Sequence, residues 1–231
     1  MKNGLNDGII DGIPIFIGYV PIAIAFGILS KNVGISMTDS VLFSVLVFAG
    51  ASQFIALNLL FLGAGIGEIV LTTLILNFRH FLMGASLATK ITNDLKRWSP
   101  LIAFGITDEV FSVASFKKGI ITKKYILSLE FLAYIAWVSG TVLGYLAGGI
   151  LPDMVKSSMG VALYAMFVAI LIPEAKKYNK AIILAILSGV TNTLFRYGFS
   201  MPQGWSIVIS ILLVSFLGVI FSNKEEVLKY E

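Results

Sequence analysis

The chain has 231 residues, of which 57% are hydrophobic and only 13% are charged. A soluble domain carries about 25% charged residues, so this composition excludes an ordinary soluble protein. It predicts an all-α polytopic membrane protein that forms a single integral-membrane domain over residues 1–231. Cysteine is absent and the net charge of +4 is not gathered into a basic stripe, which excludes disulfides, thiolate metal sites and a nucleic-acid partner.

Seven apolar segments are predicted to cross the membrane. They cover residues 12–30, 40–62, 67–89, 125–150, 158–173, 181–198 and 205–222. The first contains Pro14 and Pro21, which is compatible with a broken helix that lines a cavity or with an ordinary kinked helix. The second carries Gln53, an amide at bilayer depth, directly after a run of small residues.

Residues 100–116 are also apolar but carry Asp108 and Glu109 at their centre, which is unfavourable for a lipid-facing span. If this segment re-enters, the loops place 13 Lys and Arg residues on one side of the membrane and 2 on the other, whereas a spanning segment gives 10 and 5. The positive-inside rule favours re-entry. We therefore predict seven transmembrane helices plus one re-entrant or partly buried segment, with the N-terminus outside and the C-terminus in the cytoplasm. Eight spans are the alternative.

Two short matches indicate an internal repeat of about 117 residues, with halves at about 1–117 and 118–222. Ile17-Gly18-Tyr19-Val20 resembles Ile135-Ala136-Trp137-Val138, and Phe78-Arg79-His80 resembles Phe195-Arg196-Tyr197. If residues 100–116 re-enter, three spans separate the copies and the repeats are inverted, as in many secondary transporters. If that segment spans, the repeats are parallel.

Arg79 is the most costly residue of the predicted spans. It lies 11 residues from both Glu68 and Lys90, which places it near the middle of a membrane helix, at a cost of about 3 kcal/mol on insertion scales. Arg79 is expected to bind a carboxylate or to pair with Asp108 or Glu109. The alternative is a polar network that only fixes helix packing.

Other polar residues extend this candidate site. His80 can carry a proton but points about 100° away from Arg79. The candidate residues for substrate binding or proton coupling are Gln53, Asn77, Arg79, His80, Asp108 and Glu109, with a possible second-repeat polar site at Asn192 and Arg196. Arg196 also lies close enough to a span end to snorkel. This set suits a zwitterion with a hydrophobic tail. For Glu130, near the basic end of its span, a pair with Lys123 or Lys124 at the membrane interface is the simplest explanation.

Four motifs resemble the AzlC family of branched-chain amino acid exporters. They are Gly12-x-Pro14 through Pro21-x-Ala23-x-Ala25-Phe26-Gly27, Phe48 to Phe54, Leu76 to His80 and Thr107 to Phe111. The resemblance implies a multi-pass permease of the bacterial cytoplasmic membrane that exports leucine, isoleucine, valine or analogues. It also implies a small hydrophobic AzlD-type partner subunit. The first-half candidates, from Gln53 to Glu109, sit on the family's motif positions, whereas nothing at Asn192 or Arg196 is carried over.

The leading hypothesis is therefore the large subunit of a secondary transporter that is coupled to protons. The sequence contains no nucleotide-binding loop to drive transport, and we expect no cofactor and no metal. An intramembrane enzyme is disfavoured, because there is a single histidine, no cysteine and no hydrolase motif. The remaining alternatives are a transporter or channel for another small solute and a non-transporting membrane scaffold.

Overall fold

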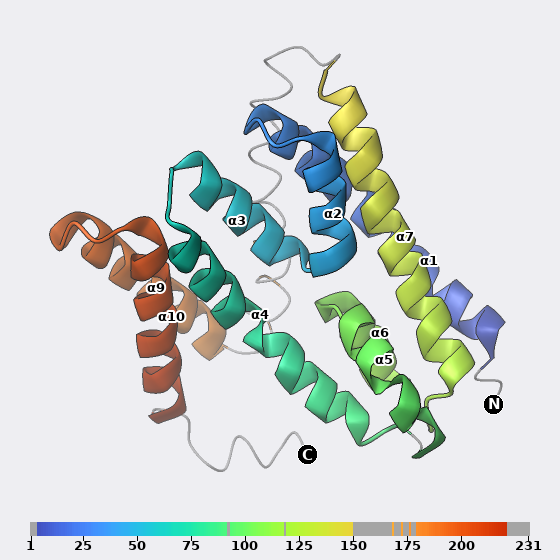
Figure 1. Cartoon of the computed structure of the whole chain (residues 1–231). Helices are drawn as coiled ribbons and strands as arrows, with labels where there is room; N and C mark the ends of the chain where they lie inside the picture. Colours follow the sequence, from blue (N-terminus) through green and yellow to red (C-terminus); the bar gives the residue numbers. More distant parts are fainter. Residues whose placement is uncertain are drawn as a thin grey trace. The chain divides into compact units, whose positions relative to one another are not determined.

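The computed structural model of the protein describes residues 4–91, 93–117, 119–149 and 179–220, with the single positions 168, 172 and 176. The regular elements of these residues are helices (Figure 1), as the composition predicted, and Ile91 and Ile121 form an isolated β-bridge. The α-helices are α1 (Leu5–Asn32), α2 (Met37–Val47), α3 (Gly50–Phe61), α4 (Ile66–Ala88), α5 (Ser99–Gly105), α6 (Asp108–Phe116), α7 (Lys123–Ala147), α9 (Asn179–Thr193) and α10 (Gln203–Ile220). Two shorter elements are η1 (Asn93–Trp98) and the π-helical η2 (Leu194–Gly198).

Among the described residues, α1, α4 and α7 are long and apolar enough to cross a membrane. They match the predicted spans 12–30, 67–89 and 125–150. The predicted span 40–62 is two shorter helices instead, α2 and α3. The predicted spans 181–198 and 205–222 match α9 with η2 and α10, although residues 221–222 are outside the described part. The predicted span 158–173 lies outside the described residues, apart from positions 168 and 172.

The chain divides into two compact units. Unit 1 contains Met1–Asn58 and Leu76–Tyr164, and unit 2 contains Leu59–Ile75 and Ala165–Glu231. These units do not coincide with the predicted repeat halves. In unit 2, α9 and α10 pack together, with Gly218 against the side chain of Leu184, and the carboxylate of Glu68 accepts a hydrogen bond from the backbone N–H of Gly204.

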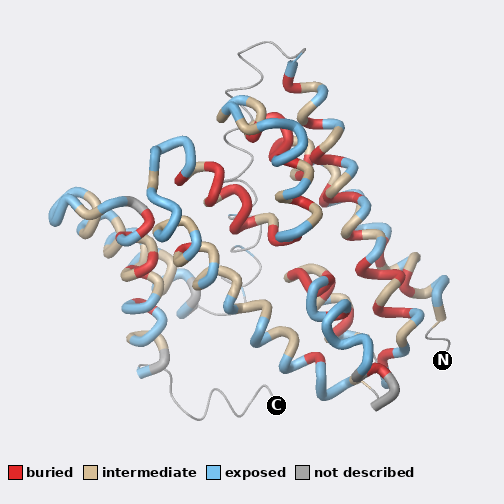
Figure 2. The backbone as a smooth tube through the Cα atoms, viewed as in Figure 1, coloured by how far each residue is buried: buried red, intermediate tan, exposed pale blue. Residues whose placement is uncertain are grey.

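In unit 1, α1 and α7 pack against each other along their length, and both helices run in the same direction. Gly8 faces Tyr125, Ala23 faces Gly140, and Gly27 faces Gly144. At Gly27 and Gly144 an added Cβ would collide with the backbone of the other helix, so glycine permits this close approach. Figure 2 shows buried residues along both helices. Each of the three facing pairs is 117 residues apart, which is the offset of the predicted repeat.

The segment predicted to cross at 40–62 instead descends along α7 and turns back. Tyr145 near the end of α7 donates a hydrogen bond to the carbonyl of Ile35 (3.0 Å), whereas Tyr134 in the middle of α7 donates to the carbonyl of Val45 (3.0 Å). The chain then reverses at Phe48, which adopts left-handed backbone angles (φ 37°, ψ 48°). It returns with Gln53 beside Trp137. The α2–α3 hairpin therefore ends half-way along α7.

Residues 98–117 form a second hairpin that approaches from the opposite end of α7. The ammonium group of Lys123 lies 3.3 Å from the ring centroid of Trp98, at the start of α7, and the rings of Phe104 and Tyr134 are 5.9 Å apart. After a break at Ile106–Thr107, α6 returns until Lys117 pairs with Asp11 (2.8 Å). The segment thus enters and leaves at the same end of unit 1, which is the geometry that re-entry requires.

The loops 90–99 and 117–124 lie together at this end, which we call the basic end. The backbone N–H of Ile121 donates to the carbonyl of Lys90 (3.3 Å). The start of α1 lies there too, because Ser128 donates its hydroxyl hydrogen bond to the carbonyl of Leu5 (3.1 Å). The predicted topology placed the N-terminus on the other side from these loops, and the structure contradicts that arrangement. The reason is that residues 40–62 turn back and therefore remove one crossing.

Because residues 40–62 turn back instead of crossing, the predicted orientation of the two repeat copies also changes. An inverted repeat would make α1 and α7 antiparallel, whereas these two helices run parallel. The expectation of inversion is therefore wrong for this pair.

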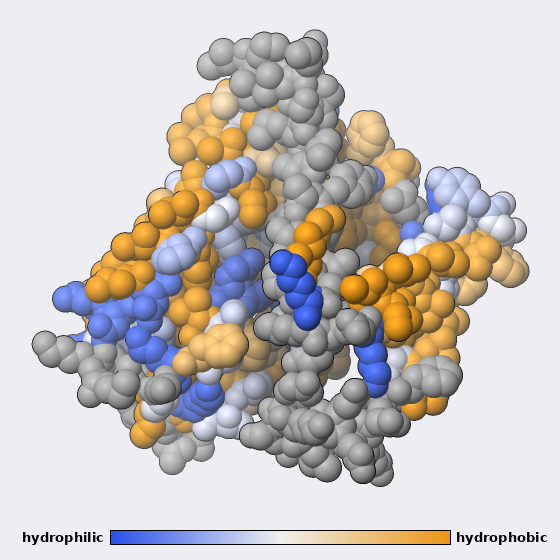
Figure 3. All heavy atoms as spheres, turned by 180° about the vertical axis from the view of Figure 1, so that it is seen from behind, coloured by the Kyte–Doolittle hydropathy of each residue, from blue (hydrophilic) through white to orange (hydrophobic). Residues whose placement is uncertain are grey.

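Many large apolar side chains are exposed, as a lipid-facing surface requires. On α4 they include Leu74, Phe78, Phe81 and Leu82. Figure 3 shows several surface areas of the described residues that are apolar.

Candidate functional site

The tips of the two hairpins meet beside the middle of α7. Phe48 at the tip of the first hairpin and Phe104 near the tip of the second have ring centroids 6.1 Å apart. Both rings also contact Tyr134, at 5.1 Å and 5.9 Å. The turns between these helices are buried, at Phe48 and Ala49 in the first hairpin and at residues 105–107 in the second, so the starts of α3 and α6 lie beside α7. Helix ends carry partial charges, and paired broken helices of this kind form the substrate sites of many transporters.

Arg79 reaches the start of α6 from α4. Its Nη1 atom lies 2.9 Å from Oδ2 of Asp108, and the two side chains are 37% and 33% exposed. Of the two partners that the sequence left open for Arg79, the structure therefore selects Asp108. The Nε of Arg79 and the Oδ1 of Asn77 are buried, and neither has a hydrogen-bond partner among the described residues. The guanidinium thus keeps donors with which it can hold a second carboxylate.

Glu109 has a different partner. The hydroxyl group of Tyr19, in the middle of α1, donates to the carboxylate of Glu109 and lies 2.7 Å from Oγ1 of Thr107, the N-cap residue of α6. Tyr19 is not among the candidate residues predicted from the sequence. The signal available in the sequence was its position in Ile17-Gly18-Tyr19-Val20, which resembles Ile135-Ala136-Trp137-Val138. In the structure its ring contacts Trp137 at 5.5 Å in an edge-to-face geometry.

Gln53 belongs to a buried network that joins α2, α3 and α7. The indole N–H of Trp137 donates to Oε1 of Gln53 (2.7 Å), and Nε2 of Gln53 donates to Oγ of Ser44 (3.2 Å). The hydroxyl groups of Ser44 and Thr141 are 2.7 Å apart. Gln53 is completely buried. Gln53 therefore connects α2, α3 and α7 through buried hydrogen bonds.

The remaining candidates are dispersed. His80 is half-buried on α4, directly after Arg79. Asn192 and Arg196 belong to unit 2, where Asn192 accepts a hydrogen bond from Ser206 (2.8 Å) and Nη1 of Arg196 donates to the carbonyl of Met201 (2.9 Å). Both second-repeat residues thus make local contacts within unit 2.

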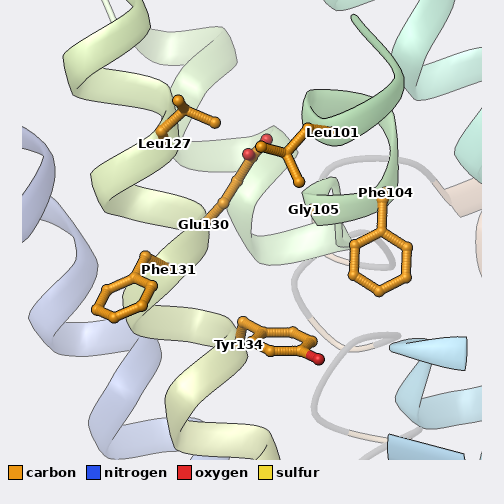
Figure 4. Close-up of a pocket in the computed structure, with 7 residues that line it drawn as sticks. All are labelled: Leu101, Phe104, Gly105, Leu127, Glu130, Phe131 and Tyr134. Atoms are coloured by element: carbon orange, nitrogen blue, oxygen red, sulfur yellow. The ribbon is translucent and has the colours of Figure 1, made fainter. Parts of the chain in front are cut away.

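Among the described residues Glu130 has no lysine partner, so the simplest explanation for it, a pair with Lys123 or Lys124, does not hold. Its side chain is 5% exposed, and its Oε1 atom has no hydrogen-bond partner among the described residues. It lies in a cavity of about 370 Å³ between α5 and α7 (Figure 4). The lining residues are Leu101, Phe104, Gly105, Leu127, Glu130, Phe131 and Tyr134.

The known proteins that this chain resembles are membrane proteins, and one of them is named AzlC. The family model described as AzlC protein matches residues 14–151. The inner membrane protein YgaZ of Escherichia coli (strain K12) is 35% identical over 191 residues, which cover 79% of this chain and 78% of that protein. An uncharacterized membrane protein of Archaeoglobus fulgidus is 36% identical over 73% of this chain and 75% of its own length. The branched-chain amino acid transport protein AzlC of Bacillus subtilis is 30% identical over 73% of this chain and 66% of its own length. No solved structure matches.

Proposed function

The chain belongs to the AzlC family, and on this basis we propose that it is the large subunit of a secondary transporter for branched-chain or other hydrophobic amino acids. The transporter would export its substrate across the bacterial cytoplasmic membrane, coupled to protons, together with a small hydrophobic AzlD-type subunit. The printed name of the Bacillus subtilis relative supports the substrate class. The export direction and the partner are supported by the family resemblance alone.

The ion pair between Arg79 and Asp108 is the observation that carries this proposal. An α-amino acid bears one carboxylate and one ammonium group. Its carboxylate can take the place of Asp108 beside Arg79, and its ammonium group can take the place of Arg79 beside Asp108. Arg79 would hold the substrate carboxylate, with support from the positive end of α6. Asp108 would hold the ammonium group. Without substrate the two side chains neutralise each other, which avoids an unpaired charge in the membrane.

The proposal is tested with the purified chain in proteoliposomes, with and without the small subunit and with a panel of labelled amino acids. Arg79→Ala should lower leucine transport about 10- to 100-fold, because a hydrogen bond to a charged group contributes about 1.5–3 kcal/mol. Arg97→Ala is the matched control, because Arg97 is exposed in the loop 90–99. Full leucine transport by Arg79→Ala would remove Arg79 from the mechanism. A wild-type protein that transports none of the panel would refute the proposed function.

A further inference from the structure

The carboxyl group of Glu130 lacks the compensation that Asp108, Glu109 and Asp11 have in unit 1. Asp108 is paired with Arg79, Glu109 accepts a hydrogen bond from Tyr19, and Asp11 is paired with Lys117. Glu130 is more deeply buried than the carboxylates of both ion pairs, and the structure describes no cation beside it. A buried carboxylate without a cation is strongly disfavoured, so this pocket suits the neutral carboxylic acid.

The end of α5 strengthens this preference. The Glu130 side chain packs directly against Gly105, the last residue of α5. A Cβ atom added to Gly105 would lie only 2.7 Å from Oε2 of Glu130. The C-terminal end of a helix carries partial negative charge. A carboxylate beside it is repelled, whereas a carboxylic acid can donate a hydrogen bond in that direction. Only glycine at position 105 permits this contact.

Among the described residues that line the cavity, none is a lysine, an arginine or a histidine. The sequence of α5 contains no ionisable side chain, and Lys123 at the start of α7 lies over the ring of Trp98. Tyr134 is the other titratable lining residue, and its hydroxyl donates to the carbonyl of Val45 (3.0 Å). Figure 4 shows the Glu130 side chain directed towards Gly105 and Leu101. A proton is thus the cation that this site can take without another charged group.

The cavity reaches the surface of unit 1. Its volume is about 370 Å³, and its lining side chains are apolar apart from the carboxyl group of Glu130 and the hydroxyl group of Tyr134, which are the groups that can hold a water molecule there. Its rim is apolar, because Leu101 and Phe131 are 49% and 59% exposed. Glu130 lies seven residues after Lys123, about 10 Å along α7 from the basic end.

We propose that Glu130 is the binding site of the coupling proton. This inference rests on the proposed function and moves the proton site away from Asp108 and Glu109. In the release step, the O–H bond of the Glu130 carboxylic acid breaks and the proton passes to a water molecule in the cavity. The side chain is then a carboxylate. Protonation from the other side of the membrane reverses the step. The end of α5 disfavours the carboxylate, so the empty carrier takes up a proton before it changes conformation.

The test compares the wild type with Glu130→Gln, which mimics the neutral acid and should therefore fold. Glu68→Gln in unit 2 is the matched control. Glu130→Gln should retain leucine–leucine counterflow without a proton gradient and lose proton-driven accumulation of leucine. Independently of any substrate, the infrared C=O band of a protonated carboxylic acid should be present in the wild type at neutral pH, remain in Glu68→Gln and disappear in Glu130→Gln.

Three results would overturn the assignment. Proton-driven accumulation by Glu130→Gln at the wild-type rate would show that another group carries the proton. Loss of counterflow together with accumulation would assign Glu130 to substrate binding. An infrared band that is absent from the wild type, or unchanged in Glu130→Gln, would show that the carboxyl is ionised. If the wild type transports no amino acid, the transport proposal fails and the infrared measurement still decides whether Glu130 holds a proton.

Discussion

Arg79 and Asp108 show how a costly residue obtains its partner. The position of an arginine near the middle of an apolar run indicated that a counter-charge was required, and the sequence offered Asp108 and Glu109. The choice between them follows from the helix geometry at the hairpin tip. Successive residues on a helix point about 100° apart, so Asp108 faces α4 while Glu109 faces Tyr19 on α1.

Trp137 provides a residue-scale prediction about the buried network. Trp137→Phe removes the indole donor and leaves Oε1 of Gln53 without this bond in a fully buried position. We expect a loss of about 1–3 kcal/mol in the free energy of unfolding, measured by thermal or denaturant unfolding in detergent. Trp205→Phe is the control, because Trp205 is 45% exposed and such a change normally alters stability by less than about 0.5 kcal/mol. Equal stability of both variants would contradict the network.

At the scale of the elements, the helix breaks differ from those that the sequence suggested. Pro14 and Pro21 were compatible with a broken first helix, but α1 is continuous from Leu5 to Asn32. The break occurs at Phe48 instead, within a run that is apolar and proline-free. A phenylalanine in left-handed conformation costs about 1–2 kcal/mol. Its ring contacts with Phe104 and Tyr134 offset this cost, and such contacts exist only in the folded unit.

The packing of α1 on α7 gives an element-scale prediction. Gly144→Ala places a methyl group against the backbone of Ile24, so the helices must separate and we expect destabilisation of about 1–3 kcal/mol. Gly18→Ala is the matched control on the exposed side of α1, where no atom lies within 4 Å of the new Cβ, and it should be neutral or stabilising by up to about 1 kcal/mol. The measurement is the unfolding midpoint of each variant. Similar midpoints for both would show that this close approach does not stabilise unit 1.

For the whole molecule, the two hairpins change the topology. The basic end contains three Lys and Arg residues in 90–99 and four in 117–124, so the positive-inside rule places it in the cytoplasm. The structure puts the start of α1 at the same end. We therefore propose a cytoplasmic start of α1, in place of the external N-terminus expected from the sequence.

Cysteine labelling tests this topology without background thiols, because the chain has no cysteine. Single cysteines at Leu5, Thr89 and Ile120 should react with an impermeant reagent from the cytoplasmic face only. A cysteine at Thr38, exposed at the start of α2, should react from the opposite face. Labelling of Leu5 and Thr38 from the same face would contradict the parallel arrangement of α1 and α7.

The predicted offset of 117 residues is the register in which α1 and α7 face each other. Two equivalent helices related by a two-fold axis along the membrane normal would meet in this way. We therefore propose a parallel repeat for this pair. The inverted repeat depended on a crossing at 40–62, and the chain turns back there.

The sequence by itself determined the membrane environment, the long helices α1, α4 and α7 and the need of Arg79 for a partner. Each of these follows from local composition, because apolar length and the cost of a charge in lipid depend on the residues themselves. The re-entry of residues 100–116 stays a prediction from the distribution of basic residues over the loops. The tertiary structure alone decided that residues 40–62 turn back, that Asp108 rather than Glu109 pairs with Arg79, and that Glu130 is buried without a cation. Those features depend on which side chains meet across different helices, and an apolar pattern along one helix does not specify its neighbours.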